Sequence, residues 1–224
     1  MIKGVTFDFG GTLAQGAFDR ETFRSRLLGY LRSLGFSGGE AQLNKAKDRM
    51  LERLGRARSH NREIRLEDLY QDMLFELGLR PESEVIGHIN QLYMDSFQTK
   101  MIEGVEEVLE ALSERYKLAV ISNAMSDVPR CALKKFGLER YFVAVVISRD
   151  LGIRKPDPEI FNFTLNRLNV EKDEAIHVGD SLEHDVKGAR NAGMKTVWLK
   201  NDNEVPDIEP DYTIHSIKEL TSFL

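Results

Sequence analysis

The second half of the chain alternates between short apolar runs and stretches of helical periodicity. After residue 101, apolar residues recur at i, i+3 and i+4 between the runs, as at Val105, Val108, Leu109 and Leu112, a spacing typical of amphipathic helices. Strands that alternate with helices predict βαβ units and a parallel sheet. The apolar runs, each bounded by turn residues, predict strands near 2–8, 117–122, 142–147, 175–179 and 195–199.

Three weaker signals complete the predicted sheet domain. Pro158, with Asp157 before it as the N-cap, is typical of the first turn of a helix. Asp211-Tyr212-Thr213-Ile214 suggests an additional edge strand. Residues 216–223 suggest a closing helix.

About a hundred residues between the first and second predicted strands carry no strand signal. They contain three amphipathic helical stretches, at 23–31, 43–54 and 66–77, which glycines separate from one another. The pattern therefore predicts that a helical insertion, over roughly 15–98, interrupts the sheet domain soon after its first strand.

The composition is that of a globular protein, with 42% hydrophobic and 30% charged residues and only 6 prolines. No segment approaches the about 18 uninterrupted apolar residues of a membrane span, and residues 1–5 lack a signal-peptide pattern. We therefore expect a cytoplasmic protein without a membrane partner. The net charge of −5 argues against a nucleic-acid partner, and the single Cys131 excludes an internal disulfide.

Polar side chains come directly after several of the predicted strands. In parallel α/β sheets, ligands bind at the carboxyl ends of the strands. Taken alone, each of these residues has an ordinary explanation as a turn, helix-cap or surface residue. Together they would bring three carboxylates, one lysine and one hydroxyl to a single crevice: Asp8, Ser122, Asn123, Lys155, Asp180 and Asp185.

Such a group of side chains suits phosphoryl transfer. Three clustered carboxylates repel one another unless a cation is present, and magnesium (Mg2+) takes oxygen ligands of this kind. A carboxylate nucleophile such as Asp8 divides the reaction into formation and hydrolysis of an aspartyl-phosphate. Lys155, Ser122 and the metal would neutralise charge on the transferred oxygens. We therefore expect a small phosphorylated substrate.

Four segments resemble, in order and spacing, the motifs of the haloacid dehalogenase-like hydrolase superfamily. They are Phe7-Asp8-Phe9-Gly10-Gly11-Thr12-Leu13, Ile121-Ser122-Asn123, Lys155-Pro156-Asp157-Pro158 and Gly179-Asp180-Ser181-Leu182-Glu183-His184-Asp185. The resemblance implies an α/β fold with a Rossmann-like parallel sheet core, over 1–14 and 99–224, and an inserted all-helical cap over 15–98.

The resemblance also implies a role for each matching residue. Asp8 would be the nucleophile and a metal ligand, and Lys155 a catalytic residue that also binds phosphate together with Ser122 and Asn123. The remaining metal ligands would be the main-chain carbonyl of Gly10, the carboxylate of Asp180, and Asp185, directly or through water.

The chain departs from the family pattern at Gly10. Most phosphatases of this family carry a second aspartate there, as general acid and base, and such assistance is worth roughly 10²- to 10⁴-fold. We therefore expect a magnesium-dependent phosphatase, monomeric or homodimeric, that favours acyl and aryl phosphates over alkyl phosphates unless a cap residue supplies the acid.

Three alternatives to a phosphatase stay open. A phosphonatase would need an imine-forming cap lysine, such as Lys45 or Lys47. A dehalogenase of this family works without a metal, which would leave Asp180 and Asp185 unneutralised. A degenerate member would bind a phosphorylated metabolite without turnover, with Gly10 as the mark of lost chemistry.

The predicted cap contains a concentration of basic residues. Between 45 and 65, eight lysines and arginines oppose three acidic residues. If this surface faces the crevice, it would attract an anionic substrate; the equally plausible interpretation is a solvated helix face.

Overall fold

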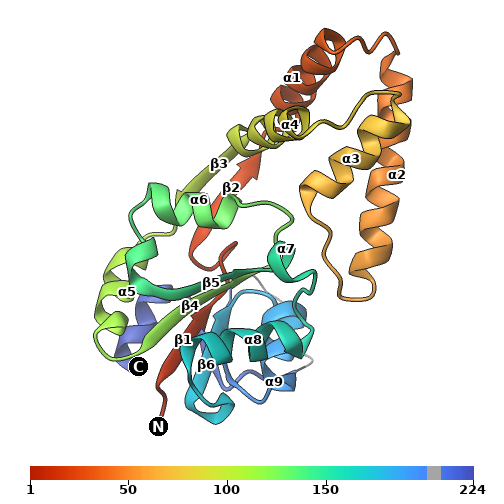
Figure 1. Cartoon of the computed structure of the whole chain (residues 1–224). Helices are drawn as coiled ribbons and strands as arrows, with labels where there is room; N and C mark the ends of the chain where they lie inside the picture. Colours follow the sequence, from red (N-terminus) through yellow and green to blue (C-terminus); the bar gives the residue numbers. More distant parts are fainter. Residues whose placement is uncertain (201–207) are drawn as a thin grey trace.

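The computed structural model of the protein describes residues 1–200 and 208–224. Figure 1 shows two parts, a sheet covered by helices and a helical cap that extends away from it. The expected fold class, an α/β Rossmann-like parallel sheet core with an inserted helical cap, is confirmed. Among the described residues, no helix is long and apolar enough to cross a membrane.

Six parallel strands form the core sheet, in the order β5-β4-β1-β6-β7-β8. The first strand is central, and Phe7 at its end lies beside Val120 of β4 and Val178 of β6. The residue that follows β1 therefore lies in the middle of the carboxyl edge of the sheet. The strands are β1 (Gly4–Phe7), β4 (Lys117–Ser122), β5 (Phe142–Ile147), β6 (Ala175–Gly179), β7 (Lys195–Leu199) and β8 (Tyr212–Ile214).

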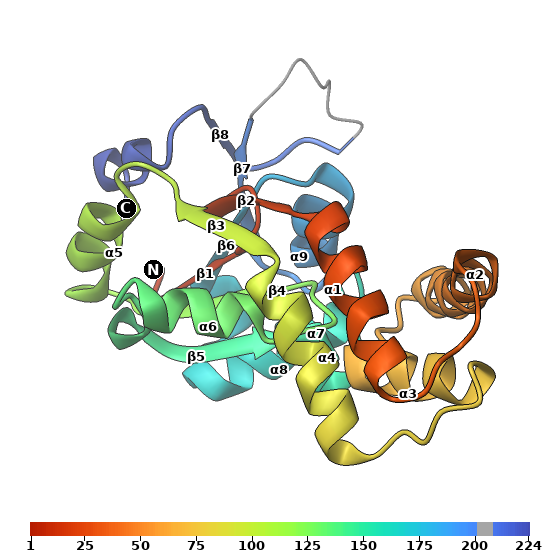
Figure 2. The ribbon, with the colours of Figure 1, turned by 90° about the horizontal axis from the view of Figure 1, so that it is seen from above.

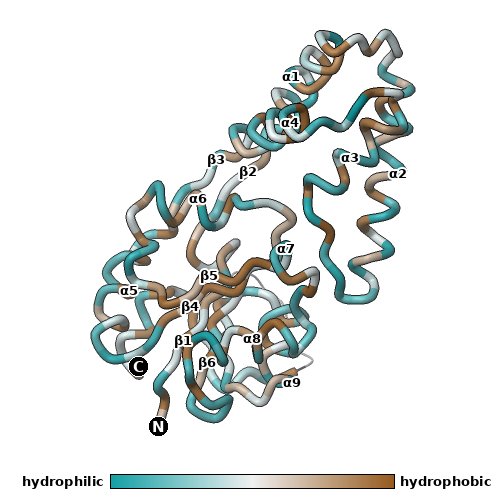
Figure 3. Tube along the Cα trace, in the orientation of Figure 1, coloured by the Kyte–Doolittle hydropathy of each residue, from teal (hydrophilic) through white to brown (hydrophobic). Residues whose placement is uncertain are grey.

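Helices bury both faces of this sheet, as Figures 1 and 2 show. On one face, Val5 and Phe7 pack with residues of α5 and α6; on the other, Ala119 and Ile121 pack with α8 and α9. Burial on both faces explains the continuous apolar runs of the strands, which are brown in Figure 3. The helices are α5 (Val105–Ser113), α6 (Val128–Lys135), α7 (Ser148–Leu151), α8 (Pro158–Leu168), α9 (Lys187–Asn191), the π-helix Leu182–Val186, and the 3-10 helices Glu139–Tyr141, Lys172–Glu174 and Ile217–Ser222.

The cap consists of four helices around a hydrophobic core of their own. Leu31, Leu74 and Ile89 are fully buried at its centre. The apolar faces predicted by helical periodicity thus pack against one another rather than against the sheet. The helices are α1 (Arg20–Ser33), α2 (Glu40–Arg58), α3 (Leu66–Glu76) and α4 (Ser83–Asp95).

An antiparallel pair of short strands, β2 (Ala14–Phe18) and β3 (Phe97–Met101), joins the cap to the core. The expectation of no strand between the first and second strands of the sheet was wrong here. Most residues of β2 are exposed, so its sequence lacks the apolar alternation of a half-buried strand. At the cap end of this pair, the rings of Phe18, Tyr93 and Phe97 lie about 5 Å apart, with centroid distances of 4.8 to 5.2 Å.

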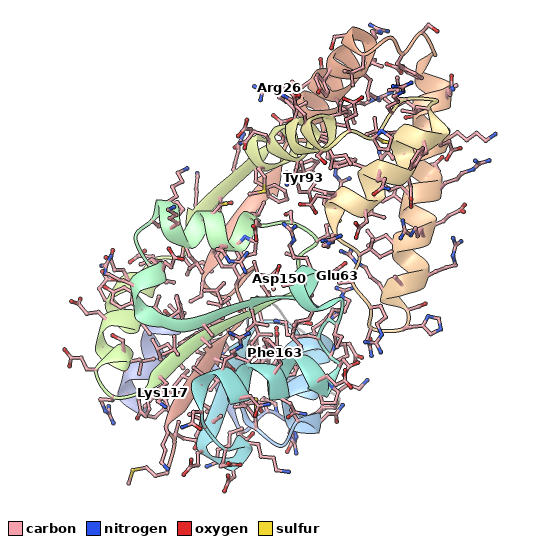
Figure 4. The ribbon with its side chains drawn as sticks, viewed as in Figure 1. Arg26, Glu63, Tyr93, Lys117, Asp150 and Phe163 are labelled. Carbon is pink, nitrogen blue, oxygen red and sulfur yellow. The ribbon has the colours of Figure 1, made fainter. Side chains whose placement is uncertain are left out.

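The cap touches the core at a second place, through residues 61–67. The amide of Glu63 donates to the carbonyl of Gly152 at 3.0 Å, and the amide of Arg154 donates to the carbonyl of Asn61 at 3.1 Å. Figure 4 labels Glu63 at this junction, close to α7. The cap is thus attached to the core both by the β2–β3 pair and by this segment.

Two local predictions have clear outcomes. Asp157 caps α8 as expected, because its carboxylate accepts from the amide of Glu159 at 3.0 Å and Pro158 opens the helix. The closing helix is shorter and tighter than expected, a 3-10 helix over Ile217–Ser222.

Candidate active site

The structure brings every predicted site residue to one pocket at the carboxyl edge of the sheet. Asp8 follows β1, Ser122 ends β4, and Asp180 follows β6, as expected for ligand-binding residues of a parallel sheet. The pocket has a volume of about 500 Å³ and lies between the sheet and the cap. The predicted residues among its lining are Asp8, Gly10, Ser122, Asn123, Lys155, Asp180 and Asp185.

Lys155 lies at the centre of the charged groups. Its Nζ is 2.6 Å from Oδ1 of Asp8 and 2.6 Å from Oδ1 of Asp185, and the lysine is 1% exposed. Burial opposes its charge, but the two carboxylates prevail and raise the pKa of Lys155 above its usual value. Lys155 is therefore a buried cation that bridges two aspartates, and not the surface lysine that its position before a proline would suggest.

The two aspartates that share Lys155 differ in their protonation. Burial raises the pKa of Asp8 well above its usual value, because desolvation and the neighbouring Asp185 outweigh Lys155. The pKa of Asp185 is lowered in spite of burial, because Lys155 and His177 both stabilise its charge. In the protein alone, Asp185 is thus the ionised partner of Lys155, and Asp8 needs a further positive charge to stay ionised at neutral pH.

Asp8, Asp180 and Asp185 form a group of oxygen donors that could hold a metal. One ligand atom from each lies within 4.8 Å of the others. Asp180 packs directly against Gly11, where a Cβ would overlap its carboxylate, and Gly11 has φ of 89°. Glycine therefore satisfies both the left-handed turn after the nucleophile and the close approach of Asp180. Three carboxylates with hard oxygen donors fit a magnesium ion.

His177 is a site residue that the sequence analysis passed over. It is 1% exposed; its Nε2 lies 3.1 Å from Oδ1 of Asp185, and its Nδ1 lies 2.8 Å from Oγ1 of Thr6. Burial lowers the pKa of His177, so the neutral ring donates to Asp185 and accepts from Thr6. A sequence signal existed, because Thr6 and His177 are polar residues inside apolar runs; their pairing as register partners on adjacent strands is visible only in the structure.

Asn123 positions Lys155. Its Nδ2 donates to the carbonyl of Lys155 at 2.9 Å, and its Oδ1 accepts from the amide of Lys155 at 2.9 Å. Ser122, beside it, is 4% exposed in the same pocket. Neither residue caps the following helix, whose N-cap is Asp127. The side chain of Asn123 thus binds the main chain of Lys155. Its predicted contact with the phosphate of a substrate stays a prediction.

The cap contributes Arg58 and Tyr93 to the pocket, and the sequence analysis singled out neither of them. Burial raises the pKa of Tyr93 to about 12. Figure 4 shows Tyr93 on the side of α4 that faces the core. Of the eight basic residues between 45 and 65, all within the described chain, Arg58 is the one that lines the pocket. Lys45 and Lys47 are exposed outside it, so neither is placed to form the imine of a phosphonatase.

Most other basic side chains of this segment form ion pairs on the cap surface. Arg49 pairs with Glu76 at 2.5 Å, Arg53 pairs with Asp72, and Arg65 pairs with Asp68 at 2.8 Å. We therefore replace the hypothesis of a broad basic surface facing the crevice by a single basic residue of this segment, Arg58, which lines the pocket.

Comparisons with known proteins agree with this geometry. The family model described as haloacid dehalogenase-like hydrolase matches residues 50–199. The chain is 30% identical to the glyceraldehyde 3-phosphate phosphatase of Methanopyrus kandleri over 94% of each chain. It is 32% identical to the pyrimidine 5'-nucleotidase YjjG of Escherichia coli over 62% of this chain and 64% of that protein. Its structure is similar to that of a 2-haloacid dehalogenase from Pseudomonas syringae, with a TM-score of 0.80 and 28% identity over 99% and 97% of the two chains.

Proposed function

The chain belongs to the haloacid dehalogenase-like hydrolases, and from that premise we propose that it is a magnesium-dependent phosphatase acting on a small phosphorylated metabolite. In this proposal, residues 1–14 and 99–224 are the catalytic core and 15–98 the cap. The observation that carries the proposal is the position of Asp8, buried at the end of β1 with Lys155 Nζ 2.6 Å away and Asp180 and Asp185 beside it.

The charge of the site supports a divalent cation. Three carboxylates whose ligand atoms lie within 4.8 Å are opposed by one lysine, so the site would carry a net charge of −2 with all three ionised, as the reaction requires of Asp8. Asp8, Asp180 and the carbonyl of Gly10 would hold magnesium, with Asp185 acting through water, because Lys155, His177 and the amide of Ser181 already occupy its oxygens. When bound, the ion would neutralise these charges and keep Asp8 ionised.

The proposed reaction has two steps. A carboxylate oxygen of Asp8 attacks phosphorus, and the bond from phosphorus to the leaving oxygen breaks, which gives an aspartyl-phosphate and a free alkoxide, phenoxide or carboxylate. Water then attacks the phosphorus and regenerates Asp8 with release of inorganic phosphate. Lys155 and the hydroxyl of Ser122 stabilise the negative charge on the transferred oxygens.

The cap supplies no matched acid to the leaving group, although His184 of the core also lines the pocket. Gly10 has no side chain, and Arg58 and Tyr93 are the titratable side chains that the described cap contributes to the pocket. Arginine remains charged, and burial raises the pKa of Tyr93 to about 12, so both side chains are able to donate a hydrogen bond to a substrate but neither is matched to proton transfer near neutral pH. This favours substrates that leave as stable anions, such as acyl and aryl phosphates.

Hydrolytic dehalogenation is the second candidate. Two observations favour it: the similarity to the 2-haloacid dehalogenase from Pseudomonas syringae, with a TM-score of 0.80, and the pairing of Asp185 with Lys155, which neutralises one of the two aspartates that argued against a metal-free site. A halide leaves without a proton, so the absence of a side chain at Gly10 would not matter. The carboxylate of Asp180, in contrast, is proposed as a metal ligand and would have no metal to bind in a metal-free site.

The two candidates are separated by one set of assays. We expect hydrolysis of acetyl phosphate and an aryl phosphate with magnesium, loss of that activity in EDTA, and no halide release from a 2-haloacid. Asp8→Asn should lower phosphatase activity by about 10³-fold or more, because the nucleophile is lost. Asp48→Asn, on the exposed surface of α2, is the matched control. Halide release independent of magnesium would replace the proposal with dehalogenation, and phosphatase activity that survives in Asp8→Asn would refute the mechanism.

A further inference from the structure

Two arginines in the wall of the active-site pocket share one carboxylate. Arg58 on α2 and Arg154 in the loop before α8 both line the pocket that holds Asp8. Arg58 Nη2 is 3.1 Å from Oε1 of Glu63, and Arg154 Nε is 3.8 Å from Oε2. The side chain of Glu63 is completely buried behind them, where it also accepts a hydrogen bond from Ser148 at 3.1 Å.

The two guanidinium groups are only half neutralised by Glu63. Arg154 has fewer partners for its charge than Arg58. Its side chain is only 14% exposed, so little water reaches it, and its Nε has no hydrogen-bond partner among the described residues. Burial lowers the pKa of Arg154, and the nearby positive charge of Arg58 lowers it further, although Glu63 opposes both effects. Arginine nevertheless keeps its charge in proteins, so an excess positive charge remains in the pocket wall.

This excess charge is distinct from the charges that surround the nucleophile. Lys155 is fully engaged by Asp8 and Asp185, whereas the two arginines are engaged by Glu63. Arg154 and Lys155 are consecutive residues, so their Cα atoms are about 3.8 Å apart. Both arginines also line the same pocket of about 500 Å³ as Asp8 and Lys155, so a small molecule whose phosphate lies against Asp8 and Lys155 can reach the arginines with the rest of its skeleton.

We propose that Arg58 and Arg154 form a second anion-binding subsite, which selects phosphorylated metabolites that carry a further anionic group a few bonds from the reacting phosphate. This proposal rests on the phosphatase function and names its substrate class. A carboxylate or a second phosphate would supply the charge that Glu63 leaves unbalanced, through charge-assisted hydrogen bonds to planar donors. Because one arginine comes from the cap and the other from the core, the same group would hold the two parts together.

The test compares substrates of equal length that differ in one charge. Phosphoglycolate is compared with glycolaldehyde phosphate, and 3-phosphoglycerate with glyceraldehyde 3-phosphate, the compound in the name of the Methanopyrus kandleri relative. 1,3-Propanediol bisphosphate, which carries a second phosphate and no carboxylate, distinguishes a second phosphate from a carboxylate. We expect kcat/KM to be about 10- to 100-fold higher for the anionic member of a pair, as for hydrogen bonds to charged groups.

Variants then assign the preference to the two arginines. Arg58→Gln and Arg154→Gln should each remove most of it, by raising KM for the anionic member much more than for the neutral member. Arg58→Lys should keep part of it. Arg56→Gln, on the same helix with a side chain that is 73% exposed, is the matched control and should keep all of it.

The outcomes separate this proposal from the proposed function. Equal kcat/KM within each pair in the unaltered protein would overturn the subsite, even if both arginine variants failed to fold. Arginine variants that slow both members equally would also overturn it, because that is the pattern of a purely structural role around Glu63. If neither these compounds nor acetyl phosphate and an aryl phosphate are hydrolysed, the phosphatase function itself fails.

Discussion

Gly10 is the residue at which the active site differs most from the phosphatase pattern, and the space around it is open. A Cβ built there meets no atom within 4 Å, so the main chain at this position can accept the first carbon of a side chain without displacing a neighbour.

We predict that Gly10→Asp raises kcat for alkyl phosphates such as glycerol 3-phosphate more than for acetyl phosphate. The added carboxyl group would protonate a poor leaving group, and full general acid catalysis is worth roughly 10²- to 10⁴-fold; we expect about tenfold or more. A leaving-group series measured on both proteins checks this, with Gly10→Asn as the control that adds similar bulk without an acid. Equal gains across the series, or gains in the asparagine control, would contradict it.

At this scale, sequence reasoning found the residues that follow a strand directly and missed those fixed by distant contacts. Asp8 and Asp180 are readable because their strands end in the residue before them. Glu63 and Arg154 are ordinary charged residues in loops, and their proximity depends on how the cap docks on the core. Asn123 was found, but its bonds to the main chain of Lys155 were not predictable, because they join two loops 32 residues apart.

Among the elements, the β2–β3 pair connects the cap to the core, and Gly16 allows its two strands to lie close together. A Cβ on Gly16 would lie 2.6 Å from the carbonyl oxygen of Gln98, a main-chain atom that cannot move aside by rotation. Gly29 in α1, in contrast, is exposed and has open space around it.

We predict opposite effects for alanine at these two glycines. Gly16→Ala should lower the free energy of unfolding by about 1–3 kcal/mol, because the added methyl forces the strands apart. Gly29→Ala should raise it by about 0.5–1 kcal/mol, because alanine is the better helix former. Urea unfolding followed by circular dichroism measures both. A Gly16→Ala protein as stable as the unaltered one would show that the strand pair can open without cost.

Helices and strands with a hydrophobic periodicity of their own could be predicted from the sequence. Those that form only because a distant segment pairs with them could not. The start of α8 follows from Asp157 and Pro158, which act within one turn. The strand β2 has neither apolar alternation nor local support, and it exists because β3, beyond the whole cap in sequence, pairs with it. The tight 3-10 helix at Ile217–Ser222 keeps a full capping box, with Ser216 and Glu219, which the sequence pattern alone did not distinguish from an α-helical start.

At the scale of the whole molecule, the cap and the core meet across an ion pair. Nη2 of Arg149 in α7 lies 2.7 Å from Oε1 of Glu67 in α3, and the arginine side chain is 12% exposed. This pair lies beside the hydrogen bond from the amide of Leu66 to the carbonyl of Met125, at 2.9 Å. It is therefore a contact that joins the cap to the core.

We predict an interaction energy of about 1 kcal/mol between Arg149 and Glu67 in a double-mutant cycle with Arg149→Ala and Glu67→Ala. Partly buried pairs in contact give coupling of roughly 0.5–3 kcal/mol. The control cycle uses Glu52 and Arg56, an exposed pair at 4.0 Å within α2, for which we expect nearly zero. Both cycles are measured by urea unfolding. Coupling across the interface no larger than in the control would mean that the cap is not held closed by this contact.

Lys155 is held from two directions, and this bears on any attempt to exchange caps between relatives. Asn123 fixes its main chain from the core, while the neighbouring amide of Arg154 donates to the carbonyl of Asn61 in the cap. A cap grafted from a relative would thus alter the position of Lys155 as well as the choice of substrate. We expect chimeras to keep their turnover only when the stretches 61–67 and 148–155 are transplanted together, as a matched pair.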